Sequence, residues 1–345
     1  MIALALAVWA MPATPLATAD DVLAYLEKNP SNVSLAVFDE GAKSPALTYG
    51  SPDAFPLAST AKAVVLVAYA RAAASGVPAF PLAELNALYW PGTDGDAHER
   101  ALADWKRLGA VRDGKVDGEQ VARAMIDQSD NAAADELMLH VGREKLAAVA
   151  GEFRVETPCP IVGQFLQWGD AAWREKAARL GRTNLATEAW ELAARRRAGA
   201  RLGGVKLFWP QLPALADQEA DADLANTRGT AAAYARLMNA VFTTTEPWGA
   251  IARDALSWPM RRFDSNRARF DVFGAKGGSL PGVLTDAIFI RRKGAARGRA
   301  AALFFRRLPP DDWRALMQSY AQQAFLVKLA TDDAYAARVK KALAP

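Results

Sequence analysis

Residues 56–74 read P-L-A-S-T-A-K-A-V-V-L-V-A-Y-A-R-A-A-A, and this stretch decides how the rest of the chain is interpreted. Between Lys62 and Arg71 it is apolar on nearly all sides, which predicts a helix buried in the middle of a domain. A membrane span needs about 20 apolar residues, whereas this run is shorter and contains a lysine. The sequence therefore places a buried helix, starting near Ser59, at the centre of the fold.

Ser59 and Lys62 are three residues apart, so on a helix the hydroxyl and the amine lie on one face. A lysine among apolar side chains loses part of its preference for the charged form and can accept a proton. A serine beside such a base is an activated nucleophile, and free N–H groups at a helix N-terminus can hold an oxyanion. The alternative is a serine that caps the helix, followed by a lysine whose amine reaches water. Because S-x-x-K is a common pattern, other motifs must decide between the two.

The chain of 345 residues has the composition of a globular protein, with a net charge of +4 that is spread along the sequence. Its densest basic clusters, at 195–201 and 291–293, have no aromatic residues between the charges, so we expect no nucleic-acid partner. The single cysteine, Cys159, excludes an intramolecular disulfide. His98 and His140 lack metal-ligand spacing, and no glycine-rich phosphate loop is present, so we expect neither a metal nor a cofactor.

Residues 1–19 resemble a secretory signal. A short apolar run is followed by small residues, with Ala17-Thr18-Ala19 as a cleavage site of the A-x-A type, although a basic start is missing. We expect cleavage there and a periplasmic or secreted protein, the alternative being an ordinary apolar tail. No other stretch is long and apolar enough to span a membrane, and we expect a monomer.

Strand-like patterns occur near both ends of the chain, with helical patterns between them. The predicted strands are 33–38, 45–49, 270–275, 283–290 and 300–305, and helices close the chain from residue 311. The sequence therefore predicts an α+β fold in which residues 20–55 and 260–345 form one antiparallel sheet flanked by helices. Residues 56–259 would be a helical lobe inserted into it, and the two parts together would form one catalytic domain. Residues 143–258 look mainly helical, with breaks expected at Gly151, at Pro158-Cys159-Pro160, at Gly181, at Gly203-Gly204 and near Asn226.

Two further motifs lift the S-x-x-K pattern above chance. Ser129-Asp130-Asn131 falls between two predicted helices, where side chains can project from a turn. Lys276-Gly277-Gly278-Ser279 ends a predicted strand, where two glycines allow another backbone or a ligand to approach closely. In kind and order, the three motifs resemble the S-x-x-K, S-D-N and K-T-G set of the serine β-lactamases and penicillin-binding proteins.

The resemblance implies a β-lactamase/transpeptidase-like fold and a role for each motif residue. Ser59 would be acylated by the substrate, and Lys62 would take its proton, although the acylation base is disputed within the family. Ser129 would pass a proton to the leaving nitrogen, and Asn131 would bind the side-chain amide of the substrate. Lys276 would attract the substrate carboxylate and lower the proton affinity of Ser129. The N–H groups of two residues would form the oxyanion hole, namely Ser59 and Ser279.

The sequence departs from the family at two places. Gly277 stands where a threonine is usual, which removes a hydroxyl that can touch the substrate. The deacylating glutamate of an E-x-x-L-N loop has no counterpart in residues 160–170, and the middle of the chain is longer than usual. Three carboxylates could replace it, and no local pattern selects one of Glu156, Asp170 and Glu188.

We therefore expect an exported serine hydrolase related to class A β-lactamases, which acts on a small β-lactam, confers antibiotic resistance and deacylates slowly. A carboxypeptidase-like or esterase activity on another acyl or amide substrate is the second interpretation. The third is a penicillin-binding or sensing protein that is acylated and never turns over.

Overall fold

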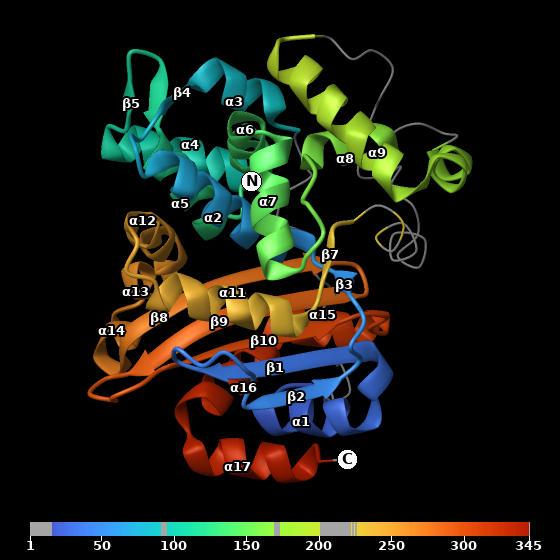
Figure 1. The fold of residues 1–345 in the computed structure, drawn as a ribbon, viewed down its shortest axis with the longest axis vertical. Coiled ribbons are helices and arrows are strands. Elements are labelled where there is room, and N and C mark those ends of the chain that lie inside the picture. The colour runs from blue at the N-terminus through green and yellow to red at the C-terminus, as the bar shows by residue number, and fades with distance from the viewer. Residues whose placement is uncertain are drawn as a thin grey trace, which may run out of the picture.

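Five strands form one antiparallel sheet in the order β2-β1-β10-β9-β8 (Figure 1). The computed structural model describes residues 16–90, 95–168, 173–200, 222, 224 and 226–344. The strands are β1 (Val33–Asp39), β2 (Leu47–Gly50), β8 (Phe270–Leu280), β9 (Val283–Arg292) and β10 (Arg299–Phe305). Because β1 pairs with β10, with Val33 opposite Phe305, the sheet joins the two ends of the chain as predicted.

One face of the sheet is covered by helices from the chain ends. They are α1 (Ala19–Lys28), α15 (Pro310–Ser319), α16 (Ala321–Thr331) and α17 (Asp333–Ala342). Leu26 and Phe325 are buried there against Leu303. The expected cleavage site falls at the start of α1, where Thr18 caps the helix in a capping box with Asp21. Leu16, just before this cap, is buried in the same core.

The other face packs against α11 (Ala231–Thr243), which separates the sheet from the helical lobe in Figure 1. Tyr234 and Phe242 of α11 contact Phe304 and Phe289 of the sheet through their rings. A single hydrophobic cluster runs from these residues into the lobe and surrounds α2 (Lys62–Ala73). The apolar stretch that was predicted to be a buried helix is therefore the centre of the larger core.

Short elements complete the lobe around α2. They are β3 (Phe55–Pro56), β4 (Ala79–Pro81), α3 (Leu82–Leu88), α4 (Ala97–Leu108), β5 (Val111–Arg112), β6 (Lys115–Asp117), α5 (Gly118–Asp127), α6 (Asn131–Val141), α7 (Arg143–Phe153), β7 (Arg228–Gly229), α12 (Pro247–Leu256), α13 (Trp258–Arg262) and α14 (Asp264–Arg269). The three-stranded sheet β4-β6-β5 and the full length of α4 were not predicted. The break expected at Gly151 was wrong, since α7 runs on to Phe153 and ends at Arg154, whose φ is +58°.

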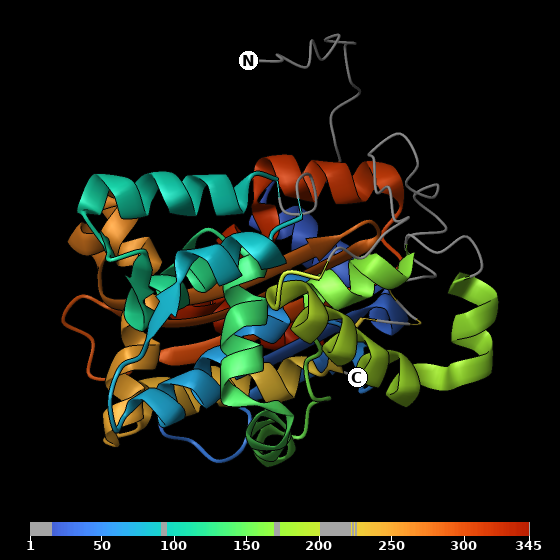
Figure 2. The ribbon, with the colours of Figure 1, turned by 90° about the horizontal axis from the view of Figure 1, so that it is seen from above.

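The extra length in the middle of the chain contains α8 (Ile161–Trp168) and α9 (Trp173–Arg197). Both views show α9 extending beyond the rest of the lobe (Figures 1 and 2). The break predicted at Gly181 is present as a kink, because this glycine has φ +71° and interrupts the helix. The break predicted at Gly203 and Gly204 lies outside the described residues.

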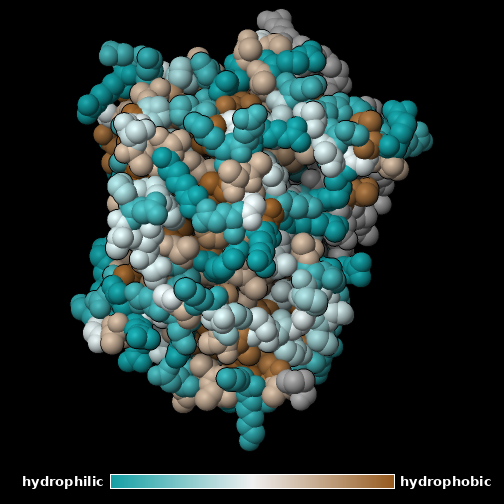
Figure 3. All heavy atoms as spheres, viewed as in Figure 1, coloured by the Kyte–Doolittle hydropathy of each residue, from teal (hydrophilic) through white to brown (hydrophobic). Residues whose placement is uncertain are grey.

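The surface mixes polar and apolar residues. On the face shown in Figure 3, small apolar patches are interspersed with hydrophilic side chains. Among the described residues, the exposed large hydrophobic side chains are far apart in the sequence: Val77, Leu108, Leu224, Phe263 and Tyr320. Within the described ranges, no helix has the length and apolar character needed to cross a membrane.

Candidate active site

Ser59 lies in a short 3₁₀ helix, η2 (Ala58–Ala61), directly before α2. Residues three apart eclipse each other in a 3₁₀ helix, so the side chain of Ser59 faces that of Lys62. Lys62 Nζ donates to Ser59 Oγ at 3.2 Å. The alternative of a capping serine is wrong, because α2 has Ala61 at its cap and no side-chain cap bond. The amine does not reach water either, since Lys62 is only 1% exposed.

The turn between α5 and α6 brings Ser129 and Asn131 to the same amine. Lys62 Nζ donates to the Ser129 carbonyl oxygen at 2.6 Å, to Ser129 Oγ at 3.3 Å and to Asn131 Oδ1 at 2.6 Å. Ser129 has φ +62°, a left-handed conformation that costs a non-glycine residue about 1 kcal/mol. The structure thus brings together the first two motifs of the sequence.

Lys276 approaches Ser129 from strand β8. Its Nζ donates to Ser129 Oγ at 3.1 Å and to the Gly277 carbonyl oxygen at 2.6 Å. Burial, with the positive charge of Lys62 as the next cause, lowers the pKa of Lys276 well below its usual range. Ser129 Oγ therefore lies between two buried amines, in an arrangement that can pass a proton along the hydroxyl.

Gly278 lies directly against the backbone of the Ser59 turn. A Cβ at this position would come within 2.6 Å of both the Leu57 carbonyl oxygen and the Ser59 nitrogen. Thr285 of β9 supports the same turn, since its hydroxyl donates to the Leu57 carbonyl oxygen at 2.8 Å. The close approach predicted for the two glycines is thus present at Gly278, and it sets the N–H of Ser59 beside the strand that carries Ser279.

Gly277 is explained by a neighbour on β9 that the sequence did not single out. A Cβ at position 277 would come within 2.8 Å of Oδ1 of Asp286. This aspartate is 4% exposed, and burial raises its pKa to about 7. Gln323 Nε2 donates to the same oxygen at 3.2 Å and fixes the carboxyl in place. The space of a threonine side chain is therefore occupied by Asp286.

Asn226 holds the strained backbone just before Ser59. Its Oδ1 accepts from the N–H groups of Leu57 and Ala58 at 3.0 and 2.9 Å. Ala58 has φ +47°, so a non-glycine residue takes a left-handed conformation next to Ser59. This contact crosses 168 residues of sequence and left no local signal that could have revealed it.

The carboxylates suggested as deacylation bases have other contacts. Glu156 Oε2 accepts from Arg182 Nη2 at 2.6 Å and from the Arg228 N–H at 2.8 Å. Glu188 forms an ion pair with Lys176, which lies on α9 before the kink at Gly181. Asp170 lies outside the described residues. Glu156 and Glu188 are thus both engaged in ion pairs, and Arg182, the partner of Glu156, also donates to the carbonyl oxygen of Asn226.

Asp135 is a buried carboxylate near Lys62 that the sequence analysis missed. It lies one turn after Asn131 on α6, and that spacing could have revealed it. Oδ1 and Oδ2 accept from the N–H groups of Ile161 and Val162, each at 2.6 Å. Burial raises its pKa to about 7, although these N–H groups and the charge of Lys62 act to lower it. The carboxyl holds the start of α8 next to the site.

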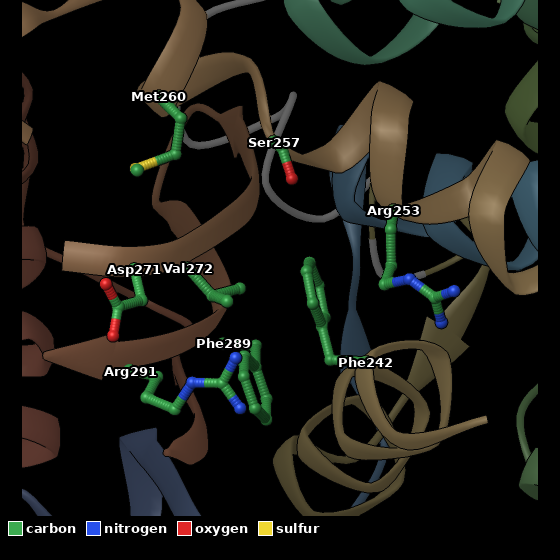
Figure 4. A pocket seen from close by; sticks show the side chains of 8 residues that line it. All are labelled: Phe242, Arg253, Ser257, Met260, Asp271, Val272, Phe289 and Arg291. Carbon is green, nitrogen blue, oxygen red and sulfur yellow. The ribbon is translucent and has the colours of Figure 1, made fainter. Parts of the chain in front are cut away.

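A cavity of about 440 Å³ lies apart from this cluster, between α11, α12, α13 and the strands β8 and β9 (Figure 4). Its arginines have structural partners: Arg253 donates to two carbonyl oxygens at the end of α11, and Arg291 to Glu40. Neither Ser59 nor Lys62 lines it. In the part of the chain that the structure describes, no group of His, Cys, Asp and Glu side chains could hold a metal ion.

Comparison with known proteins agrees with this geometry. A family model described as the β-lactamase enzyme family matches residues 17–327. Among solved structures, a class A β-lactamase from Bacteroides cellulosilyticus is 14% identical with a TM-score of 0.51, covering 92% of this chain and 99% of its own. The last common ancestor of Gram-negative class A β-lactamases is 20% identical with a TM-score of 0.50, covering 90% and 97%. No curated protein sequence matches the chain. Since the family match spans most of its length, the chain belongs to the β-lactamase enzyme family and has the class A β-lactamase fold.

Proposed function

We propose that this protein is a serine hydrolase that opens β-lactam rings through an acyl-enzyme on Ser59. The observation that supports this most is the contact of 3.2 Å between Ser59 Oγ and the buried Nζ of Lys62. A hydroxyl and an amine at this distance form a nucleophile and its base. Membership of the β-lactamase family supplies the substrate class.

In the acylation step, Lys62 must be in its neutral form, so that across the contact of 3.2 Å its Nζ accepts from Ser59 Oγ instead of donating to it. Ser59 Oγ then attacks the lactam carbonyl carbon while its proton moves to this amine. The new oxyanion is stabilised by the N–H groups of Ser59 and Ser279. The carbon–nitrogen bond of the ring then breaks, and the leaving nitrogen takes the proton of Ser129 Oγ. Lys62 returns a proton to Ser129 across their contact of 3.3 Å, which completes the transfer.

Two side chains orient the substrate in this proposal. Lys276 presents its N–H groups beside Ser129, and these can donate to the carboxylate that β-lactams carry. Asn131 offers its amide to the side chain of the substrate, because its Oδ1 is held by Lys62 and its position is thereby fixed. Gly277 leaves one hydrogen bond to the carboxylate unmade, so we expect weaker substrate binding than a threonine would give.

Deacylation is the slow step in this proposal. It requires a base that activates a water molecule, and the contacts of Glu156 and Glu188 engage both in ion pairs of the middle region. The same observation favours a second candidate function, a penicillin-binding protein that remains acylated. A carboxypeptidase-like or esterase activity is the third, and Gly277 favours it.

One experiment separates these functions. The protein is mixed with a chromogenic cephalosporin in excess, absorbance is followed, and intact mass is measured at intervals. Colour that continues past one equivalent supports a β-lactamase. An adduct that persists without further colour supports the penicillin-binding protein. Neither colour nor adduct contradicts both and leaves an activity on other acyl substrates, which ester and D-alanyl-D-alanine peptide substrates would test.

We also propose that the protein is exported, as residues 1–19 suggest. Because Thr18 caps α1 and Leu16 is buried, removal of residues 1–19 would cost the helix its cap and the core one side chain. Cleavage upstream of Leu16 would avoid this cost. N-terminal sequencing of the protein recovered from a periplasmic extract would show the position, and recovery of an unprocessed chain from the cytoplasm would contradict export.

A further inference from the structure

A histidine and an aspartate are paired, fully buried, directly behind the Ser129 turn. His98 Nδ1 lies 3.0 Å from Oδ2 of Asp130, and neither side chain is exposed to solvent. His98 comes from α4, an element that the sequence did not predict in full, and none of the three motifs includes it. A buried carboxylate is costly unless it is hydrogen-bonded, so this contact is important for the turn.

Both carboxylate oxygens of Asp130 are held in place by neighbouring groups. Oδ1 accepts from the N–H groups of Ala132 and Ala133 at 2.8 and 3.2 Å and caps α6. Oδ2 faces the imidazole of His98. Asp130 is the middle residue of the Ser129–Asn131 turn, so the rotation of its carboxyl group fixes the backbone between the two side chains that contact Lys62.

The imidazole ring is fixed on its other sides too. Its Nε2 lies 3.1 Å from Oδ1 of Asn86 on α3. The ring stacks on Tyr89 at 4.7 Å between centroids and meets the edge of Trp105 at 6.2 Å. Because these contacts fix the ring, only Nδ1 can face Asp130. A carboxylate partner makes that nitrogen a donor.

The turn needs such support, because it is strained. Ser129 keeps a φ of +62°, and strain of this kind persists only where neighbouring contacts hold the backbone. Lys62 holds the turn from the side of the reaction, through the Ser129 carbonyl oxygen and Asn131. His98 holds it through Asp130, a residue that none of the contacts of Lys62 described above involves.

We propose that His98 is a positioning residue that keeps the Ser129–Asn131 turn in the geometry required for proton transfer to the leaving nitrogen. It acts through Asp130, and its ring contacts Asp130 and Asn86 rather than Ser59 or Lys62. The proposal rests on the proposed function, since it concerns the same acylation step.

Two substitutions test which ring nitrogen matters. In His98→Asn the amide nitrogen occupies the place of Nδ1 and can still donate to Asp130. In His98→Gln the amide nitrogen occupies the place of Nε2, so the bond to Asn86 survives and the bond to Asp130 is lost. We expect His98→Asn to be acylated close to the wild-type rate. His98→Gln should be acylated roughly 10²-fold more slowly, the effect of a displacement of about 1 Å in a catalytic group. His140→Asn, at the other histidine of the chain, is the control.

The acylation rate constant and the melting temperature are measured for each variant. Equal acylation rates for the Asn and Gln variants, with similar losses of stability, would show a purely structural role and overturn the proposal. A wild-type protein that no β-lactam acylates would contradict the proposed function itself. A normal wild type with a normal Gln variant would contradict only the role of His98.

If the variants do not fold, a measurement on the wild-type protein tests the same proposal. With only two histidines in the chain, a sample labelled with ¹⁵N-histidine gives two sets of ring signals, and His140→Asn assigns them. Acylation by a β-lactam should shift the Nδ1–H signal of His98 and leave His140 unchanged. A His98 signal that does not respond to acylation would overturn the coupling.

Discussion

The Ser59 cluster and the insertion that carries α8 and α9 use their charged side chains in opposite ways. In the cluster, Lys62 and Lys276 are 1% and 3% exposed, and their amines donate to hydroxyl, carbonyl and amide oxygens. In the insertion, Lys176 pairs with Glu188, and these side chains remain 27% and 29% exposed. Partly exposed pairs of this kind contribute about 0–1 kcal/mol each.

This difference indicates which region carries the chemistry. Burial and the charge of Lys62 lower the pKa of Lys276, and a buried amine of lowered proton affinity is typical of a site where a proton must be moved. In the described part of the insertion, Glu188 is instead paired with Lys176 and Glu156 with Arg182, so these two carboxylates are engaged in ion pairs. The contacts of the cluster therefore fit the acylation step of the proposed reaction.

The largest effect is expected from substitution of Ser59, the proposed nucleophile. Ser59→Ala should abolish both hydrolysis and covalent labelling by a β-lactam, because the variant lacks the hydroxyl that would form the ester. The fold should persist, as Ser59 forms no cap bond for α2. Intact mass after incubation is the measurement, with Ser75→Ala, at an exposed serine, as the control. An adduct on the Ser59→Ala protein would show that another residue reacts.

Lys62→Arg tests whether Lys62 is the base that takes the proton of Ser59. A guanidinium keeps the positive charge but cannot be deprotonated in a protein, so it cannot take the proton of Ser59. We expect the acylation rate to fall by about 10²–10⁴, the contribution of a general base. Stopped-flow measurement with a chromogenic substrate gives the rate, and Lys145→Arg on the surface of α7 is the control. A rate near that of the wild type would shift the role of base to another group.

Deacylation is expected to be slower than acylation. On mixing with excess β-lactam, product should appear in a burst near one equivalent and then slowly, as an acyl-enzyme accumulates. Glu188→Gln should leave the slow phase unchanged, because this carboxylate is paired with Lys176. Linear turnover without a burst would reveal a competent base, and a slower second phase in the Glu188→Gln protein would identify it.

The smallest effect on activity is expected for Asp286, which occupies the space beside Gly277 and whose substitution should change stability instead. Its pKa is raised from 3.8 to about 7, so between these values the folded state holds a proton that the unfolded state lacks. This contribution to the free energy of unfolding therefore falls as the pH rises from about 4 to 7. Asp286→Asn cannot ionise, so it should gain stability relative to the wild type over that range, on the order of 4 kcal/mol. Urea unfolding at both pH values measures this, with the exposed Asp311→Asn as the control. A constant difference between variant and wild type would contradict the raised pKa.

The sequence predicted those features that have local causes. The apolar run after Lys62 is sufficient to indicate a buried helix, and the alternating pattern near both termini is sufficient to indicate the strands. The motifs identified five side chains that the fold brings together: Ser59, Lys62, Ser129, Asn131 and Lys276.

Contacts between distant segments could not be predicted in the same way. His98 and Asp286 are ordinary residues in the sequence, and only tertiary packing sets them against Asp130 and Gly277. Ser59 was expected at the start of an α-helix, but the Asn226 contact and the left-handed Ala58 place it in a 3₁₀ turn. Local propensity carries no information about a constraint that arrives from more than a hundred residues away.

The contact between the Ser59 turn and strand β9 has a consequence for synthesis. The Leu57 carbonyl beside Ser59 is held by Thr285, a partner 228 residues later in the chain. At about 5–20 residues per second, a ribosome needs roughly 10–45 s to add that length. During this interval the apolar α2 stretch exists without its sheet, and contacts of such long range also fold slowly. The nascent chain must therefore be protected from aggregation until its last third has been made, and a prematurely terminated chain would contain Ser59 and Lys62 but no assembled site.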